Sequence, residues 1–266
     1  MQANIKGLVD RLELSQANAM MPLYEAISNA VDAIEEHQDG FINHSIRIRL
    51  VASNDLAHQG GDGTMVVDGF DVIDDGVGFN DKNLASFQEA HTLSKVKVGG
   101  RGVGRFTFLK VFSSVHIRSV FKRDGKALLR EFDFSIEDEL KGADVTSEVA
   151  EKSGTQTSLR GMDEKFRAGW PTQPETIAER VIAHFLIRFA ARSCPPMTLE
   201  SPGHAPIDLH ALFQSTVLAH IEEQFFDVSG HTFALQAYRH RDGRSRHELN
   251  LCANGREVTT AKLRDL

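Results

Sequence analysis

The chain has 266 residues, enough for one large domain or two of modest size. Hydrophobic residues make up 41% of it and charged residues 25%, which is typical of a soluble globular protein. The formal net charge of −7 argues against nucleic-acid binding over the whole surface, although a local basic patch is compatible with it.

The spacing of the cysteines and histidines matches no common metal site or disulfide framework. Cys194 and Cys252 stand far apart and form no CxxC pair, and the 12 histidines show no HExxH spacing. The sequence has no signal peptide and no apolar run near 18 residues. We therefore expect a cytoplasmic protein that does not contact the membrane.

Residues 25–33 (EAISNAVDA) place two carboxylates and one carboxamide on a single helical stripe. At about 100° per residue, Glu25, Asn29 and Asp32 fall within roughly 60° of each other. Such a stripe suits a divalent cation and an attacking water, but it is also compatible with a solvated helix face. The apolar side chains fall on the opposite side and predict a buried face, formed by Met20, Leu23, Ile27, Val31 and Ile34.

A second motif follows two expected strands, over residues 45–51 and 65–73. The later strand runs into Asp74, which is followed by Asp75, Gly76, Val77 and Gly78. A carboxylate at a strand end, followed by two glycines, indicates a turn whose backbone lies close to another group. A plain Asp-Gly hairpin turn is the alternative.

A third motif is the glycine cluster at residues 99–106, before a short helix expected over 106–111. Glycines before a helix N-terminus supply free N–H groups and a favourable dipole for an anion such as phosphate. The spacing fits neither GxGxxG nor GxxxxGK[ST]. Residues 91–98, which follow a short helix expected over 83–90, are polar and lack hydrophobic periodicity, as is typical of a mobile lid.

The remaining sequence predicts further strands and helices. Paired strands are expected over 114–121 and 127–135, followed by an exposed acidic connection at 136–152. A strand over 154–159 opens with Gly154 and Thr155, and a helix is expected over 174–192. Strands at 232–238 and 248–253 flank a basic tip, which would contact phosphate backbone or be solvated. Its arginines are Arg239, Arg241, Arg244 and Arg246.

The order of these motifs across about residues 20–160 resembles the GHKL ATPase superfamily. That superfamily includes gyrase B subunits, MutL mismatch-repair proteins, the ninety-kilodalton heat-shock chaperones, MORC proteins and histidine kinases. The resemblance implies an α+β fold of the Bergerat type, a two-layer α/β sandwich with a mixed sheet and helices on one face. It is nearest to the branch of MutL, MORC and the heat-shock chaperones.

The resemblance also divides the chain into two parts. Residues 1–196 would form the ATP-binding domain, with residues 1–18 as an N-terminal arm. The sequence LCANGREV at 251–258 is similar to a transducer strand of MutL-like proteins. We therefore expect residues 197–266 to begin a transducer-like α/β domain within a longer protein.

The resemblance implies a role for each residue of the first two motifs. Glu25 would be the general base that deprotonates the attacking water, and Asn29 would hold Mg²⁺. Asp32 would lie near the metal water shell or the nucleotide. Asp74 would accept a hydrogen bond from the exocyclic amine of adenine, while Gly76 and Gly78 would let the backbone approach the base.

The other motifs would complete the nucleotide site. Thr155 would reach adenine, often through water, with Gly154 giving it room. Residues of the lid and the glycine cluster would contact the phosphates. These are Lys95, Lys97, Gly100, Arg101, Gly102, Val103, Gly104, Arg105 and Phe106. A structural role is the alternative for Arg101 and Arg105.

We accordingly expect Mg²⁺-dependent ATP binding and hydrolysis that drives dimerisation of two N-terminal domains as a molecular gate. Glu25 favours hydrolysis over phosphotransfer of the histidine-kinase type. An ATP-sensing scaffold, or a chaperone-like module, with little turnover is the alternative. The expected partners are ATP, a second copy of the chain and a larger C-terminal region. The sequence does not indicate whether a client would be DNA or protein.

Overall fold

The computed structural model describes residues 5–37, 40–41, 43–53, 66–89, 104–137, 139–240, 248–253 and 255–262. The chain divides into two compact units. One comprises Met1–Ile177 and Pro195–Pro206, and the other comprises Ala178–Cys194 and Ile207–Leu266. The expected boundary after residue 196 therefore does not coincide with the division, because residues 178–194 cluster with the C-terminal unit. Each unit is described by itself.

The first unit contains one large sheet and most of the helices. Its helices are α1 (Ile5–Arg11), α2 (Met21–Glu35), α3 (Asp81–Glu89), α4 (Gly104–Val111) and α5 (Glu164–Arg167), with a 3-10 turn at Gln16–Asn18. Its strands are β1 (Ile46–Ala52), β2 (Val67–Asp74), β3 (Phe112–Arg123), β4 (Lys126–Ser135), β5 (Glu139–Lys141), β6 (Thr146–Glu148), β7 (Gly154–Met162) and β8 (Met197–Glu200).

The sheet is mixed, which confirms the expected α+β class. Its strands run in the order β5-β4-β3-β7-β2-β1-β8, and β6 pairs with β4. β1 and β8 are parallel, whereas the other neighbours described here are antiparallel. The register places Asp74 opposite Ile46 on one side and opposite Thr155 on the other.

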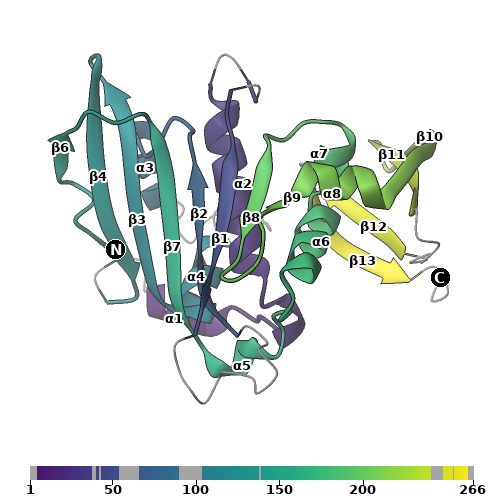
Figure 1. Ribbon diagram of the computed structural model, residues 1–266, viewed down its shortest axis with the longest axis horizontal. Coiled ribbons are helices and arrows are strands. Elements are labelled where there is room, and N and C mark those ends of the chain that lie inside the picture. Colours follow the sequence, from purple (N-terminus) through teal and green to yellow (C-terminus); the bar gives the residue numbers. More distant parts are fainter. Residues whose placement is uncertain are drawn as a thin grey trace. The chain divides into compact units, whose positions relative to one another are not determined.

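Helices α1 to α4 lie together on one face of this sheet (Figure 1). The alternation along β1 shows the same arrangement, because Ile46, Ile48 and Leu50 are buried while Arg47 and Arg49 are exposed. The unit therefore has two layers, with its core between the helices and the sheet.

Helix α2 packs against β2 and β1. The five apolar residues predicted to be buried are at most 2% exposed, which confirms the predicted helix face. Pro22 lies in the first turn, where its missing N–H costs no hydrogen bond. Beneath one end of the sheet, Phe70 packs edge-on against Phe112 and stacks on Trp170.

The opposite sheet face carries charged side chains that pair across strands. Arg49 lies 3.2 Å from Glu200, and Arg118 lies 2.7 Å from Glu151. Arg160 contacts the buried carboxylate of Asp71 at 2.5 Å. Such pairs let one face of an antiparallel sheet remain open to solvent.

Three sequence expectations differ from the structure. The acidic connection at 136–152 includes β5 and β6, because its backbone pairs with β4. The helix expected over 174–192 is interrupted at Phe185, giving α6 (Pro174–His184) and α7 (Leu186–Ala190). The strands at 232–238 and 248–253 do not form one hairpin, and most of the expected basic tip, residues 241–247, lies outside the described residues.

The C-terminal unit contains two separate hairpins. β10 (Val217–Val228) pairs with β11 (His231–His240), and β12 (Glu248–Ala253) pairs with β13 (Arg256–Lys262). Ser229 and Gly230 between β10 and β11 both have positive φ, at 52° and 80°, as a type I′ turn requires. The unit also contains α7 and most of α6, together with β9 (Ile207–Asp208) and α8 (Leu209–Thr216).

Candidate functional site

Helix α2 presents the predicted acidic stripe away from its buried face. Asn29 and Asp32 are exposed, whereas Glu25 is half-buried. A Cβ built on Gly104, the first residue of α4, would overlap the carboxylate of Glu25. The structure therefore brings Glu25 to the N-terminus of the helix at the end of the glycine cluster, although 78 residues lie between Glu25 and Gly104 in the sequence.

Asp74 ends β2 as a buried carboxyl group with 9% exposure. The N–H of Gly76 donates to its Oδ1 at 2.9 Å. Burial raises the pKa of Asp74 to about 7, and the nearby charge of Asp75 adds to this rise. Hydrogen bonds from the backbone of Gly76 and Thr155 lower the pKa but do not offset the loss of solvation.

Gly76 is required by the close approach of the 74–78 turn to α2. A Cβ at Gly76 would lie 2.8 Å from the carbonyl carbon and Cβ of Ala33. The next N–H, of Val77, donates to the carbonyl oxygen of Ala33 at 3.1 Å. Because the obstructing atoms include helix backbone, a larger residue would have to move the turn.

The first residues of β7 pack against the same turn. A Cβ at Gly154 would overlap the carbonyl oxygen of Asp74, and Gly154 has a φ of +156°. Thr155, which is 6% exposed, lies beside Asp74 in the sheet. The structure thus brings together Asp74, Gly76, Gly78, Gly154 and Thr155.

The sequence analysis missed Ser119 on β3. Its side chain is fully buried and its Oγ accepts a hydrogen bond from the N–H of Phe79 at 2.8 Å. The same Oγ lies 3.1 Å from the carbonyl oxygen of Gly154 and 2.9 Å from Oγ1 of Thr155. A usable signal was present, because Ser119 interrupts the apolar alternation of Val115, Ile117 and Phe121.

Arg105 and Phe106 lie in the interior. Arg105 is 4% exposed, donates to the carbonyl oxygen of Phe87 and holds its guanidinium 4.5 Å from the centre of the Phe87 ring. Burial lowers the pKa of Arg105 to about 10, while the negative charge of Glu25 opposes that change. Phe106 is 1% exposed and belongs to the core.

The other predicted phosphate contacts lie outside the described residues. These are Lys95, Lys97, Gly100, Arg101, Gly102 and Val103. Among the residues that are described, no group of three or more His, Cys, Asp or Glu side chains could hold a metal ion. A single amide such as that of Asn29 would need further oxygen ligands, which a nucleotide's phosphates provide.

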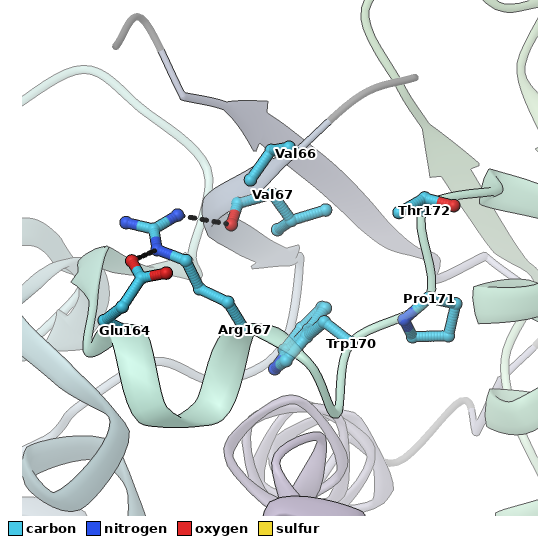
Figure 2. Close-up of a pocket in the computed structure, with 7 residues that line it drawn as sticks. All are labelled: Val66, Val67, Glu164, Arg167, Trp170, Pro171 and Thr172. Atoms are coloured by element: carbon cyan, nitrogen blue, oxygen red, sulfur yellow. Dashed lines mark hydrogen bonds and ion pairs between the residues drawn. The ribbon is translucent and has the colours of Figure 1, made fainter. Parts of the chain in front are cut away.

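Figure 2 shows a separate hollow of about 220 Å³ at the beginning of β2. Trp170, Val66, Val67 and Pro171 form its apolar wall. Nε of Arg167, at its rim, lies 2.8 Å from Glu164. Val67 and Asp74 are at opposite ends of β2, so this hollow is distinct from the candidate site.

In comparisons with known proteins, no family model matches this chain, and no curated protein matches it significantly. Within the described ranges, no helix is both long and apolar enough to cross a membrane.

The raised pKa of Asp74 predicts a pH-dependent stability. Between about pH 4 and 7 the folded state keeps a proton that the unfolded state has lost, so this group makes stability fall as pH rises. In Asp74→Asn the free energy of unfolding should no longer fall by about 1.4 kcal/mol per pH unit between pH 5 and 6, a slope that halves as the pH reaches the pKa near 7. Urea unfolding of both proteins at several pH values measures this.

Asp144→Asn provides the control, because Asp144 is an exposed carboxylate of the same unit. A stability difference between wild type and Asp74→Asn that stays constant from pH 5 to 7 would contradict a protonated Asp74.

Proposed function

We propose that this chain binds ATP with Mg²⁺ and hydrolyses it in a Bergerat-type site between α2 and the sheet. The observation that carries the proposal is the convergence of separate motifs. Gly76 packs on α2, Gly154 packs on Asp74, and Gly104 lies against Glu25. Each motif would be unremarkable alone, but these contacts link the carboxylates of Glu25 and Asp74 with helix α2, the N-terminus of α4 and the start of β7.

Asp74 and Thr155 would bind the adenine base. A buried carboxylate at a strand end can accept a hydrogen bond from an exocyclic amine, which adenine has and guanine lacks at the same ring position. The glycines at positions 76, 78 and 154 allow close backbone packing around Asp74 and Thr155, because a Cβ at each would overlap neighbouring protein atoms. Burial strengthens such a hydrogen bond because water does not compete for it.

The α2 stripe and the N-terminus of α4 would bind the phosphates and the Mg²⁺ ion. Asn29 would offer its side-chain oxygen to Mg²⁺, which neutralises phosphate charge and polarises the reacting group when bound. Glu25 would act as the general base for water. The N–H groups at the N-terminus of α4 are suited to phosphate oxygens.

The first test is ATP binding by calorimetry in the presence of Mg²⁺. At pH 8, above the raised pKa of Asp74, we expect wild type to bind and Asp74→Asn to bind at least about tenfold more weakly, because losing a hydrogen bond to a charged group costs about 1.5–3 kcal/mol. Asp144→Asn is the matched control and should bind as wild type does. Equal affinity in all three proteins would show that Asp74 does not bind the base.

The second test separates binding from turnover. Glu25→Gln should leave ATP affinity within about twofold of wild type and lower the hydrolysis rate by about 10²–10⁴-fold, the usual contribution of a general base. Glu35→Gln removes a carboxylate from the same helix and should change neither quantity. If wild type and Glu25→Gln hydrolyse ATP equally slowly, the ATP-sensing alternative replaces the enzyme.

The third test concerns the proposed gate, in which nucleotide binding drives two copies together. Light scattering with Mg²⁺ and a non-hydrolysable ATP analogue should show a doubling of mass that is absent without nucleotide. Asp74→Asn should remain at the lower mass under the same conditions. An unchanged mass, in wild-type protein that calorimetry shows to be saturated, would contradict the gate.

A further inference from the structure

Ser119 lies outside every motif of the sequence, yet it joins two of them. It is on β3, and its Oγ contacts Phe79, which follows the turn of Asp74, and both residues that open β7. A Cβ at Gly78 would lie 2.9 Å from this Oγ, so the turn packs directly on the hydroxyl.

The three contacts of Ser119 determine the direction of each hydrogen bond. A serine hydroxyl has one hydrogen to donate and two lone pairs that accept. The N–H of Phe79 can only donate, and the carbonyl oxygen of Gly154 can only accept. Ser119 must therefore use its hydrogen for Gly154, and Thr155 must donate its own hydrogen to Ser119 to satisfy the 2.9 Å contact.

This arrangement leaves the Thr155 hydroxyl with lone pairs and no free hydrogen. Thr155 is the sheet neighbour of Asp74, whose carboxylate also accepts hydrogen bonds. We propose that Ser119 is a specificity-determining positioning residue that makes Thr155 an acceptor, so that the site selects 6-amino over 6-oxo purine nucleotides. This inference rests on the proposed ATP site.

The selectivity ratio tests the inference. Affinities for ATP and ITP, which differ at the 6-position of the base and in the hydrogen that ITP carries on N1, are measured by calorimetry with Mg²⁺. In Ser119→Ala, the Thr155 hydrogen is released and can turn toward a 6-oxo group. We expect the preference for ATP over ITP to fall about tenfold, the effect of about one hydrogen bond.

Ser158→Ala is the matched control for stability. Ser158 is a buried hydroxyl of the same sheet that accepts a hydrogen bond from Gln156 at 3.1 Å, and its register places it on the opposite sheet face from Thr155. Both serine variants should unfold at a lower temperature than wild type, but Ser158→Ala should keep the wild-type preference for ATP.

A double-mutant cycle shows whether Ser119 acts through Thr155. In a Thr155→Val background, Ser119→Ala should change the ATP/ITP ratio no further. An unchanged ratio in Ser119→Ala, or equal effects in both backgrounds, would overturn the inference while leaving ATP binding established. Failure of wild type to bind either nucleotide would instead refute the proposed function and this inference with it.

If Ser119→Ala does not fold, Ser119→Cys provides the same comparison, because a thiol is a poor acceptor.

Discussion

The contact between the 76–77 backbone and Ala33 holds the candidate site together. The carbonyl of Ala33 lies in the last turn of α2, where helix carbonyls have no partner within the helix. The N–H of Val77 supplies that partner, and Gly76 allows the approach because it has no Cβ. One contact therefore completes the helix end and sets α2 against the end of β2. The distance between the α2 stripe and Asp74 depends on it.

The same region carries charges that do not favour folding. Asp74 is buried with a pKa raised to about 7, and the α2 stripe combines acids with an amide. The guanidinium of Arg105 is also buried, and its Nε and Nη2 have no hydrogen-bond partner among the described residues. Buried charge is destabilising unless it is paired, so a large apolar core has to compensate. Groups with perturbed pKa values collected in this way are typical of functional sites rather than of structural ones.

The elements that were predicted well are those with a strong local signal. The apolar periodicity of α2 and the alternation along β1 and β4 can be recognised from residues that are close in sequence. The same holds for the turn at Asp-x-Gly-x-Gly, because its residue types favour a turn. Strand pairing depends on distant partners, which explains why β11 and β12 were expected to form one hairpin although each pairs elsewhere. Arg105 was expected at the phosphates because it follows a glycine cluster, but aromatic rings at 4.5 and 5.2 Å surround its guanidinium. Ser119 was missed because its importance comes from three residues on other segments.

The two faces of the sheet offer different surroundings to polar groups. On the open face, charged groups such as Arg118 and Glu151 pair with each other in contact with water, and such pairs contribute little energy. On the helix face, Asp74, Thr155 and Ser119 are withdrawn from water, and each of their hydrogen bonds is therefore stronger and more directional. A ligand that meets these groups must match their donors and acceptors, because an unmatched buried group costs about 1–3 kcal/mol. The glycines of three motifs let backbone segments pack closely around these buried groups, because a Cβ at Gly76, Gly104 or Gly154 would overlap neighbouring protein atoms.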